Sequence, residues 1–346
     1  MRHARRIGAR ENTEGSKVKR FLNRSGLALG AALAAACMAG PASAGEITIG
    51  HTIWVGYGPL YLARDLGYFK QGGVDVKLQV VDDNALAMAA EAAGRMNGSA
   101  STIDEILKYR SPHFCFKTVT VLDDSYGGDG IVVRDNINSL KDLQGKTVAI
   151  NEGSTSQFWF SYVLLKQHIP LDSITFSNMS ADDAAAAFIA GHVPAAVTWE
   201  PNLTLVKTKH VGKVLMDSRS IPGVIVDVLQ LTCKTIQDQP KDVQALVDGV
   251  FRAVEYAKQH PKEADAIMAK GVGGYLSKPS DFADAEKGVR FYDHAMAVKY
   301  LGTTAQPGQI DDIIKLGNEI WKAVGKMKDT VTYPEVVDPH FVQTTH

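Results

Sequence analysis

Residues 182–201 read DDAAAAFIAGHVPAAVTWEP, and residues 82–105 read DDNALAMAAEAAGRMNGSASTIDE. In both stretches two aspartates lead into an alanine-rich helical pattern, a glycine follows, and a short strand pattern ends in polar and acidic residues. Any two βα units of an alanine-rich protein share some of these features, so chance similarity stays open as an alternative. We interpret the repeat as two similar α/β lobes that face each other.

The rest of the chain continues this alternation. Strand patterns cover residues 46–51, 74–81, 118–122, 131–133, 147–150 and 224–226, and helical patterns cover residues 60–66, 85–96 and 157–162. This order predicts an α/β fold built around mainly parallel sheets. From Pro240 onward the patterns are mostly helical, over residues 242–258, 261–269, 280–300 and 306–324. We expect these helices to complete the first lobe.

The composition limits the classes of partner. The chain has 346 residues, which is enough for two domains of ordinary size. Its formal net charge is -1, so it lacks the basic field that attracts nucleic acid or an acidic membrane surface. We therefore expect no nucleic-acid partner.

The first 44 residues have the features of a secretory signal peptide. Basic residues between Arg2 and Arg24 precede an apolar run over residues 27–39, and Ala42-Ser43-Ala44 matches a cleavage site. The apolar run is shorter than the roughly 20 residues that span a membrane. Cys37 loosely resembles a lipoprotein processing site, but the larger apolar residue expected three positions earlier is missing. We expect cleavage after Ala44 and a periplasmic protein rather than an anchored lipoprotein.

Two cysteines remain in the mature chain, Cys115 and Cys233. An oxidising compartment permits a disulfide between them, and a pair of buried free thiols is the alternative that spacing leaves open. The sequence has no CxxC pair and no histidine cluster with ligand spacing. We therefore expect no metal site.

Ligands of open α/β sheets bind beyond the carboxyl ends of the strands, so the residues after each strand pattern are candidates for a ligand site. These candidates are Trp54 and Tyr57; Thr102, Asp104 and Glu105; Asp123, Asp124 and Ser125; Ser154 and Thr155; Trp199 and Glu200; and Asp227.

Carboxylates and aromatic rings recur among these candidates. Carboxylates favour a cationic or N–H-rich ligand through charge-assisted hydrogen bonds, and the rings of Trp54, Tyr57 and Trp199 could stack on a planar or cationic group. The alternative for each position is that the acid caps the next helix and the ring belongs to the core. We favour a ligand role for Asp104 and Glu200, because they follow equivalent strands of the two lobes.

Residues 153–156 read GSTS and precede a helical pattern. Free N–H groups at such a helix start attract an anion or a carbonyl oxygen, although serine and threonine are also ordinary caps. The run lacks the lysine of a nucleotide-binding P-loop, and the sequence contains neither a G-x-S-x-G nor an H-E-x-x-H motif. We therefore expect neither an enzyme with named catalytic residues nor a cofactor.

Three motifs together resemble the nitrate/sulfonate/taurine type of ABC-importer binding protein, within the NMT1/THI5-like superfamily. They are WVGYGPLYLARDLGYF at residues 54–69, SLKDLQGKTVA at 139–149 followed by Gly153-Ser154, and VTWEP at 197–201. The resemblance covers nearly the whole mature chain. It implies a type II periplasmic-binding-protein fold, in which two α/β lobes joined by two crossovers clamp a ligand. Its site positions correspond to Trp54, Tyr57, Thr102, Asp104, Ser125, Ser154, Thr155, Trp199 and Glu200.

The resemblance also implies a role. We expect a monomer with a signal peptide at 1–44, a first lobe formed by 45–128 and 229–346, and a second lobe at 129–228. It would deliver its ligand to a membrane permease. The acids at the strand ends favour an amine, guanidine, urea-like compound, aminopyrimidine or zwitterion such as taurine over a simple anion. The alternatives are a pyrimidine-synthase-like enzyme, whose cysteine-rich motif is absent here, and a ligand-sensing module for a membrane receptor.

Overall fold

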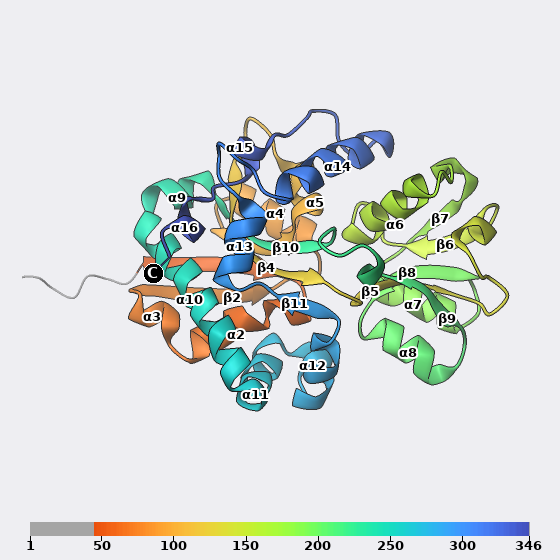
Figure 1. The fold of residues 1–346 in the computed structure, drawn as a ribbon, viewed down its shortest axis with the longest axis horizontal. Coiled ribbons are helices and arrows are strands. Elements are labelled where there is room, and N and C mark those ends of the chain that lie inside the picture. Colours follow the sequence, from red (N-terminus) through yellow and green to blue (C-terminus); the bar gives the residue numbers. More distant parts are fainter. Residues whose placement is uncertain (1–44, 346) are drawn as a thin grey trace, which may run out of the picture. The chain divides into compact units, whose positions relative to one another are not determined.

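Two β-sheets organise the chain, which the computed structural model describes over residues 45–345 (Figure 1). The first sheet has the strand order β11-β4-β10-β3-β1-β2 and the second has the order β7-β6-β8-β5-β9. The strands of the first sheet are β1 (Gly45–His51), β2 (Val74–Val80), β3 (Gly98–Thr102), β4 (Phe116–Ser125), β10 (Val226–Thr232) and β11 (Val289–Phe291). Those of the second are β5 (Asp129–Val133), β6 (Thr147–Ile150), β7 (Thr175–Asn178), β8 (Ala195–Trp199) and β9 (Lys213–Asp217).

The two sheets share one topology over five strands. In the first, β1 pairs in parallel with β2 and β3, and β10 runs antiparallel to both β3 and β4. In the second, β6 pairs in parallel with β7 and β8, and β5 runs antiparallel to both β8 and β9. The chain enters the second sheet between β4 and β5 and returns between β9 and β10. The predicted α/β fold with two similar lobes is confirmed. In the first sheet β10 and the edge strand β11 run antiparallel to the other strands, and in the second β5 does.

Helices connect and cover these strands. In the first lobe they are α2 (Gly58–Asp65), α3 (Tyr68–Gln71), α4 (Asn84–Ala92) and α5 (Ile103–Ile106), and in the second α6 (Thr155–Lys166), α7 (Ala181–Ile189) and α8 (Asn202–Lys209). The C-terminal helices are α9 (Cys233–Asp238), α10 (Pro240–Gln259), α11 (Pro261–Val272), α12 (Pro279–Glu286), α13 (His294–Leu301), α14 (Ile310–Ala323), α15 (Tyr333–Val336) and α16 (His340–Gln343). The blue-green to blue helices after β10 gather around the first sheet in Figure 1.

The helix starts follow from side-chain caps. Asp83 accepts hydrogen bonds from the backbone N–H groups of Ala85 and Leu86 at the start of α4. In the repeat it is Ser180, and not the aspartate pair, that caps α7. The helix predicted to reach Met96 ends at Ala92 because Gly94 adopts a positive φ of 70° soon after it.

Two predicted segments differ from the structure. The helical pattern over residues 280–300 contains two helices, α12 and α13, with the short strand β11 between them. Gly288 and the pairing of β11 with β4 interrupt the helix, because backbone groups that bond to a neighbouring strand cannot also continue a helical ladder. The strand predicted over residues 224–226 begins only at Val226, so Asp227 lies inside β10 rather than after it.

Cys115 and Cys233 form a disulfide, which decides between the two alternatives left open by the sequence. Their Cα atoms lie 5.4 Å apart, and the backbone N–H of Cys233 donates to the carbonyl of Cys115. The signal peptide predicted at 1–44, including Cys37, lies outside the described residues. The lobe boundaries stay a prediction, although the one between residues 228 and 229 falls within β10.

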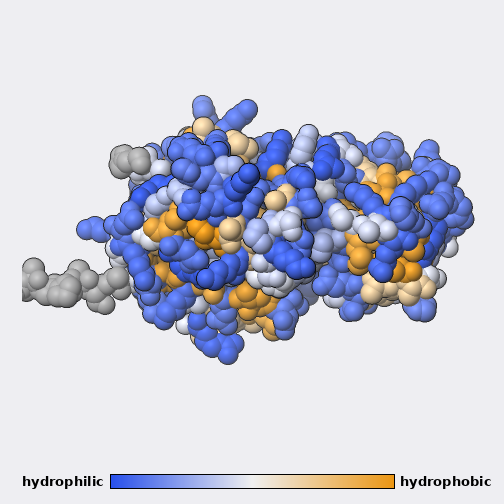
Figure 2. All heavy atoms as spheres, turned by 90° about the horizontal axis from the view of Figure 1, so that it is seen from below, coloured by the Kyte–Doolittle hydropathy of each residue, from blue (hydrophilic) through white to orange (hydrophobic). Residues whose placement is uncertain are grey.

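The surface is mostly hydrophilic. Figure 2 shows one face on which hydrophobic patches are separated by hydrophilic side chains. Among residues 45–345, the large hydrophobic residues that stay exposed are Val80, Leu86, Leu165 and Leu205. Within residues 45–345, no helix combines the length and the apolar character that a membrane span requires.

Candidate ligand-binding site

A cavity of about 730 Å³ lies where the two lobes meet. This volume falls within the range of ordinary small-molecule sites. The first sheet and the segments packed on it contribute Thr52, Ile53, Trp54, Tyr57, Val80, Val81, Asp82, Asp83, Asn84, Ala85, Thr102, Glu105, Lys108, Tyr109, Ile225, Asp227, Tyr275 and Lys326. The second sheet and the segments packed on it contribute Asp129, Asn151, Glu152, Gly153, Ser154, Thr155, Ser180, Asp182 and Trp199. Both lobes therefore contribute polar side chains to a single space.

The turn after β1 supplies two aromatic side chains to this cavity. Residues Val55–Tyr57 form a short 3₁₀ turn after β1, which puts Trp54 and Tyr57 on its cavity side. The Trp54 Nε1–H donates to Asp123 Oδ1 at 3.1 Å, and the Tyr57 hydroxyl donates to Asp227 Oδ1 at 2.6 Å. Both donors thus hold carboxyl groups of the central strands β4 and β10.

The start of α6 forms the opposite wall. Ser154 caps this helix by accepting from the N–H of Ser156, and its hydroxyl donates to the carbonyl of Asn151. Thr155 at the first turn meets Thr102 of β3 through a hydroxyl–hydroxyl hydrogen bond that joins the lobes. The partial positive charge of the helix start therefore faces the cavity.

Two lysines bring positive charge to the same wall. The Lys108 ammonium donates to the Gly153 carbonyl and lies 4.6 Å from the centre of the Trp321 ring. Burial lowers the pKa of Lys108, against the opposing effect of Glu105. Lys326 forms an ion pair with Glu152 at 3.7 Å. The helix start and these lysines together suit a ligand anion or carbonyl oxygen.

Several carboxyl groups that line the cavity have raised pKa values. Burial raises the pKa of Asp227 to about 7, while the hydrogen bond from Tyr57 opposes the rise. Burial also raises the pKa of Asp129 to about 7, with Ser125 opposing, and raises the pKa of Glu105. These shifts arise because a low-dielectric surrounding disfavours the charged form of a carboxyl group.

Comparison with known proteins identifies the family of this chain and a relative that covers most of its length. The sequence model described as NMT1/THI5 like matches residues 54–264. The chain belongs to the NMT1/THI5-like family. The recognition from three motifs is therefore confirmed. A Bacillus subtilis protein named "Putative aliphatic sulfonates-binding protein" is 27% identical over 312 residues, which are 86% of this chain and 87% of the relative.

Solved structures show the same fold as this NMT1/THI5-like chain. The periplasmic aliphatic sulphonate binding protein SsuA of Escherichia coli matches with a TM-score of 0.68 at 15% identity, over 85% of this chain and 97% of SsuA. The desulfurization enzyme DSZB matches with a TM-score of 0.59 at 14% identity, over 86% of this chain and 98% of the enzyme. At these identities the likeness concerns the fold alone, and that fold serves both a binding protein and an enzyme.

Eight of the predicted site residues line the cavity of this family member: Trp54, Tyr57, Thr102, Glu105, Ser154, Thr155, Trp199 and Asp227. The residues that follow the strands were good candidates because the cavity lies at the edge where the parallel strands end. The antiparallel strand β10 begins at the same edge. Asp227 reaches the edge from the start of its strand, where it pairs with Thr102.

The other five predicted residues lie outside the cavity lining. Asp123 sits behind Trp54, and Asp104 is fully buried, its pKa raised by burial and then by the charge of Glu105. Asp124 pairs with Arg290 and accepts from the N–H of Gly223. Asp123 and Asp124 therefore have partners that strand-end position does not reveal, and Asp104 is buried by the packing around it.

The side chains of Ser125 and Glu200 have hydrogen-bond partners within the protein. The Ser125 hydroxyl bonds to that of Ser218 at 2.8 Å, so it links the two crossovers. Glu200 accepts from the N–H and the hydroxyl of Thr204, both at 3.0 Å, and thereby caps α8. Asp104 and Glu200 were favoured because they follow equivalent strands of the two lobes, but neither residue lines the cavity.

Sequence reasoning missed several lining residues. Lys108 follows Asp104 by four positions, and helical spacing could have placed it near the acids. Asp129 opens the first strand of the second lobe, directly after the crossover. Tyr275 and Lys326 come from the C-terminal region, and no local signal marks them, because only the packing of that region on the first lobe brings them here.

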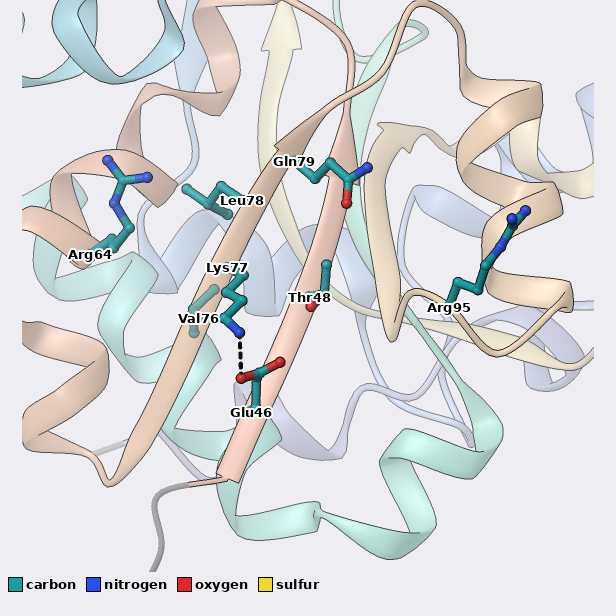
Figure 3. A pocket seen from close by; sticks show the side chains of 8 residues that line it. All are labelled: Glu46, Thr48, Arg64, Val76, Lys77, Leu78, Gln79 and Arg95. Atoms are coloured by element: carbon teal, nitrogen blue, oxygen red, sulfur yellow. Dashed lines mark hydrogen bonds and ion pairs between the residues drawn. The ribbon is translucent and has the colours of Figure 1, made fainter.

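A second depression, of about 590 Å³, lies over β1 and β2 (Figure 3). Its side chains include Arg64, Arg95 and a Lys77–Glu46 ion pair at 2.5 Å. The side chains of that pair are more than half exposed, 56% and 55%. Exposed ion pairs contribute little free energy, and this depression lacks the buried polar groups of the cavity between the lobes.

Proposed function

We propose that this protein is the solute-binding component of an ABC importer, exported to the periplasm. It captures a small polar nitrogen-containing ligand between two lobes, 45–128 with 229–346 and 129–228, and delivers it to a membrane permease as a monomer. The observation that carries the proposal is the cavity between the lobes, with aromatic rings and buried carboxyl groups. Support also comes from the binding-protein names of the relatives.

The preference for a nitrogen-containing ligand follows from the excess of acidic side chains in the cavity. Seven acidic side chains line the cavity, against Lys108 and Lys326: Asp82, Asp83, Glu105, Asp129, Glu152, Asp182 and Asp227. A simple anion would be repelled by this excess, whereas an ammonium, guanidinium or amidinium group would gain charge-assisted hydrogen bonds. A zwitterion such as taurine fits both walls, with its sulfonate at the start of α6 near Lys108 and its ammonium near Asp227.

A thermal-unfolding screen tests this function. The panel contains agmatine, methylguanidine, 2-aminopyrimidine, urea, taurine and methanesulfonate. A ligand at 100 times its dissociation constant stabilises the folded state by about 2.7 kcal/mol. We expect at least one nitrogen-containing member to stabilise the protein and Asp227→Asn to abolish that shift. Stabilisation by methanesulfonate alone would overturn the nitrogen assignment.

Controls separate binding from turnover and sensing. Lys108→Gln should lower the affinity for taurine and leave the affinity for methylguanidine unchanged, because only the zwitterion carries an anionic group. Ligand recovered unaltered after long incubation supports binding, and a new product supports the enzyme alternative. Uptake of the bound compound in cells, lost when the partner permease is deleted, supports transport over sensing. Light scattering checks the monomer.

A further inference from the structure

Two buried carboxyl groups lie side by side at the back of the cavity. Asp123 of β4 and Asp227 of β10 are paired directly in the antiparallel register, and the two residues are 0% and 3% exposed. Trp54 and Tyr57 each donate one hydrogen bond to one oxygen of this pair. Neighbouring residues of an antiparallel pair have Cβ atoms about 5 Å apart, so the two carboxyl groups interact strongly.

A third carboxyl group enters from the other lobe. Asp129 of β5 is 5% exposed and lines the same cavity as Asp227. We call Asp123, Asp129 and Asp227 the carboxyl trio. Other charged or titratable groups around the trio are Tyr57 beside Asp227, Asp104 and Glu105 of α5, Asp124 of β4, Glu200 after β8, and Tyr275 and Tyr292 of the C-terminal region.

None of the trio has a basic partner within residues 45–345. Arg290 is engaged by Asp124, and the Lys108 ammonium is engaged by the Gly153 carbonyl. One oxygen of Asp123, Oδ2, is buried and has no hydrogen-bond partner among the described residues. A buried ionised oxygen without a donor is strongly unfavourable, so this arrangement calls for a proton or for a donor brought from outside.

The electrostatics agree with this geometry. Burial, followed by the charge of Asp227, raises the pKa of Asp123. With Asp129 and Asp227 both near pKa 7, the empty trio retains protons at neutral pH, because like charges at short range in a buried site cannot all ionise.

We propose that the carboxyl trio is a proton-exchanging cation subsite, which holds protons when empty and releases those of Asp129 and Asp227 to solvent when a cationic N–H group of the ligand binds. The ligand's N–H groups then donate to the ionised oxygens of Asp227 and Asp129, which line the cavity. No covalent bond forms, and the displaced protons pass to water. This inference rests on the proposed function, because it deepens the nitrogen-containing class to a positively charged one.

The close packing of Gly56 on Asp123 determines which carboxyl groups of the trio exchange protons. A Cβ atom at this position would lie 1.9 Å from Asp123 Oδ2, so the turn backbone packs directly on that oxygen. The ligand therefore reaches Asp227 and Asp129, while Asp123 stays covered and keeps its proton. Within residues 45–345 no group of three or more His, Cys, Asp or Glu side chains has an arrangement suited to a metal ion, so an organic cation is the occupant that fits.

Infrared spectroscopy of the full chain tests the inference. The carboxylic-acid C=O band reports protonated Asp and Glu directly. At pH 6.5 we expect this band in the empty protein, a weaker band in Asp227→Asn, and an unchanged band in the matched control Asp182→Asn, an exposed cavity acid bonded by Asn202. Excess methylguanidinium should reduce the wild-type band, and methanesulfonate should not.

Two results would overturn the inference: a band at pH 6.5 that Asp227→Asn leaves undiminished, or a band that stays unchanged when a guanidinium or ammonium compound stabilises the protein against thermal unfolding. Where methylguanidinium binds, its affinity should rise from pH 5 to 6.5 by up to tenfold per pH unit for each of the two carboxyl groups, Asp129 and Asp227, that ionises on binding, and level off above about pH 8. Failure of the proposed function is distinguishable, because it appears as stabilisation by methanesulfonate alone. A cation that stabilises the protein without changing the band overturns only the proton exchange.

Discussion

The Tyr57 hydroxyl donates to Asp227 Oδ1 at 2.6 Å, and this bond joins the turn after β1 to the strand that brings the chain back to the first lobe. The two residues are 170 positions apart. Their contact puts an aromatic ring and a carboxyl group on the same wall of the cavity. It also makes the protonation of Asp227 depend on the Tyr57 hydroxyl, which the substitution Tyr57→Phe removes while keeping the ring.

Tyr57→Phe should raise the pKa of Asp227. A hydrogen bond to a charged group is worth about 1.5–3 kcal/mol, so losing it should shift the titration upward by about 1–2 pH units. The pH dependence of the carboxylic-acid infrared band measures the shift. Tyr275→Phe is the matched control, because Tyr275 lines the same cavity but donates to the Ile53 carbonyl. An equal shift in both variants would contradict a specific role for Tyr57.

The stability of the protein should fall between pH 4 and 7 through Asp129 and Asp227. Their pKa values rise from 3.8 in the unfolded chain to about 7, so the folded state binds protons more tightly, and each group favours folding where it is protonated. The free energy of unfolding then decreases as pH rises through this window and levels off above about pH 7. Each group accounts for roughly 4 kcal/mol at most.

Asp227→Asn removes one of these two contributions. Urea unfolding at pH 5 and pH 8 should therefore show a smaller decrease in stability for the variant than for the wild type. The exposed Asp182→Asn serves as the control and should keep the wild-type difference. If Asp227→Asn keeps it as well, the carboxyl group is ionised throughout this range.

Glu200→Gln should change ligand affinity little, since Glu200 is not among the residues that line the cavity and its carboxylate accepts from Thr204 at the start of α8. Glu200→Ala should lower the free energy of unfolding by about 1 kcal/mol, the usual loss for a removed helix cap. Calorimetric titration with the ligand found by the screen and urea unfolding measure the two effects. A large loss of affinity in Glu200→Gln would return this residue to the site.

Cys233→Ser should destabilise the protein strongly. The disulfide with Cys115 spans 118 positions, and a closed loop of about 100 residues corresponds to roughly 4.7 kcal/mol of denatured-state entropy. Unfolding in denaturant, with and without reductant, measures the change. Reductant should lower the stability of the wild type and leave the variant unaffected; equal stability of both proteins under oxidising conditions would contradict the prediction.

Local sequence accounts for most of the fold. The two alanine-rich stretches became α4–β3 and α7–β8, because helix periodicity, glycine stops and short apolar strands act within a few residues. The resemblance of three motifs identified the family. The pattern was insufficient where a long-range pairing competed with it, as in residues 289–291, which join β4 as a strand within a helical pattern.

The sequence by itself determined that two similar α/β lobes form and that acids and aromatic rings follow their strands. Only the tertiary structure decided which of those acids face the cavity. Asp227 reaches it because β10 runs antiparallel to β3, and Asp124 does not because Arg290 arrives from the C-terminal region to pair with it. The physical reason is range: periodicity and caps act between near neighbours, whereas burial and charge pairing depend on residues a hundred or more positions away.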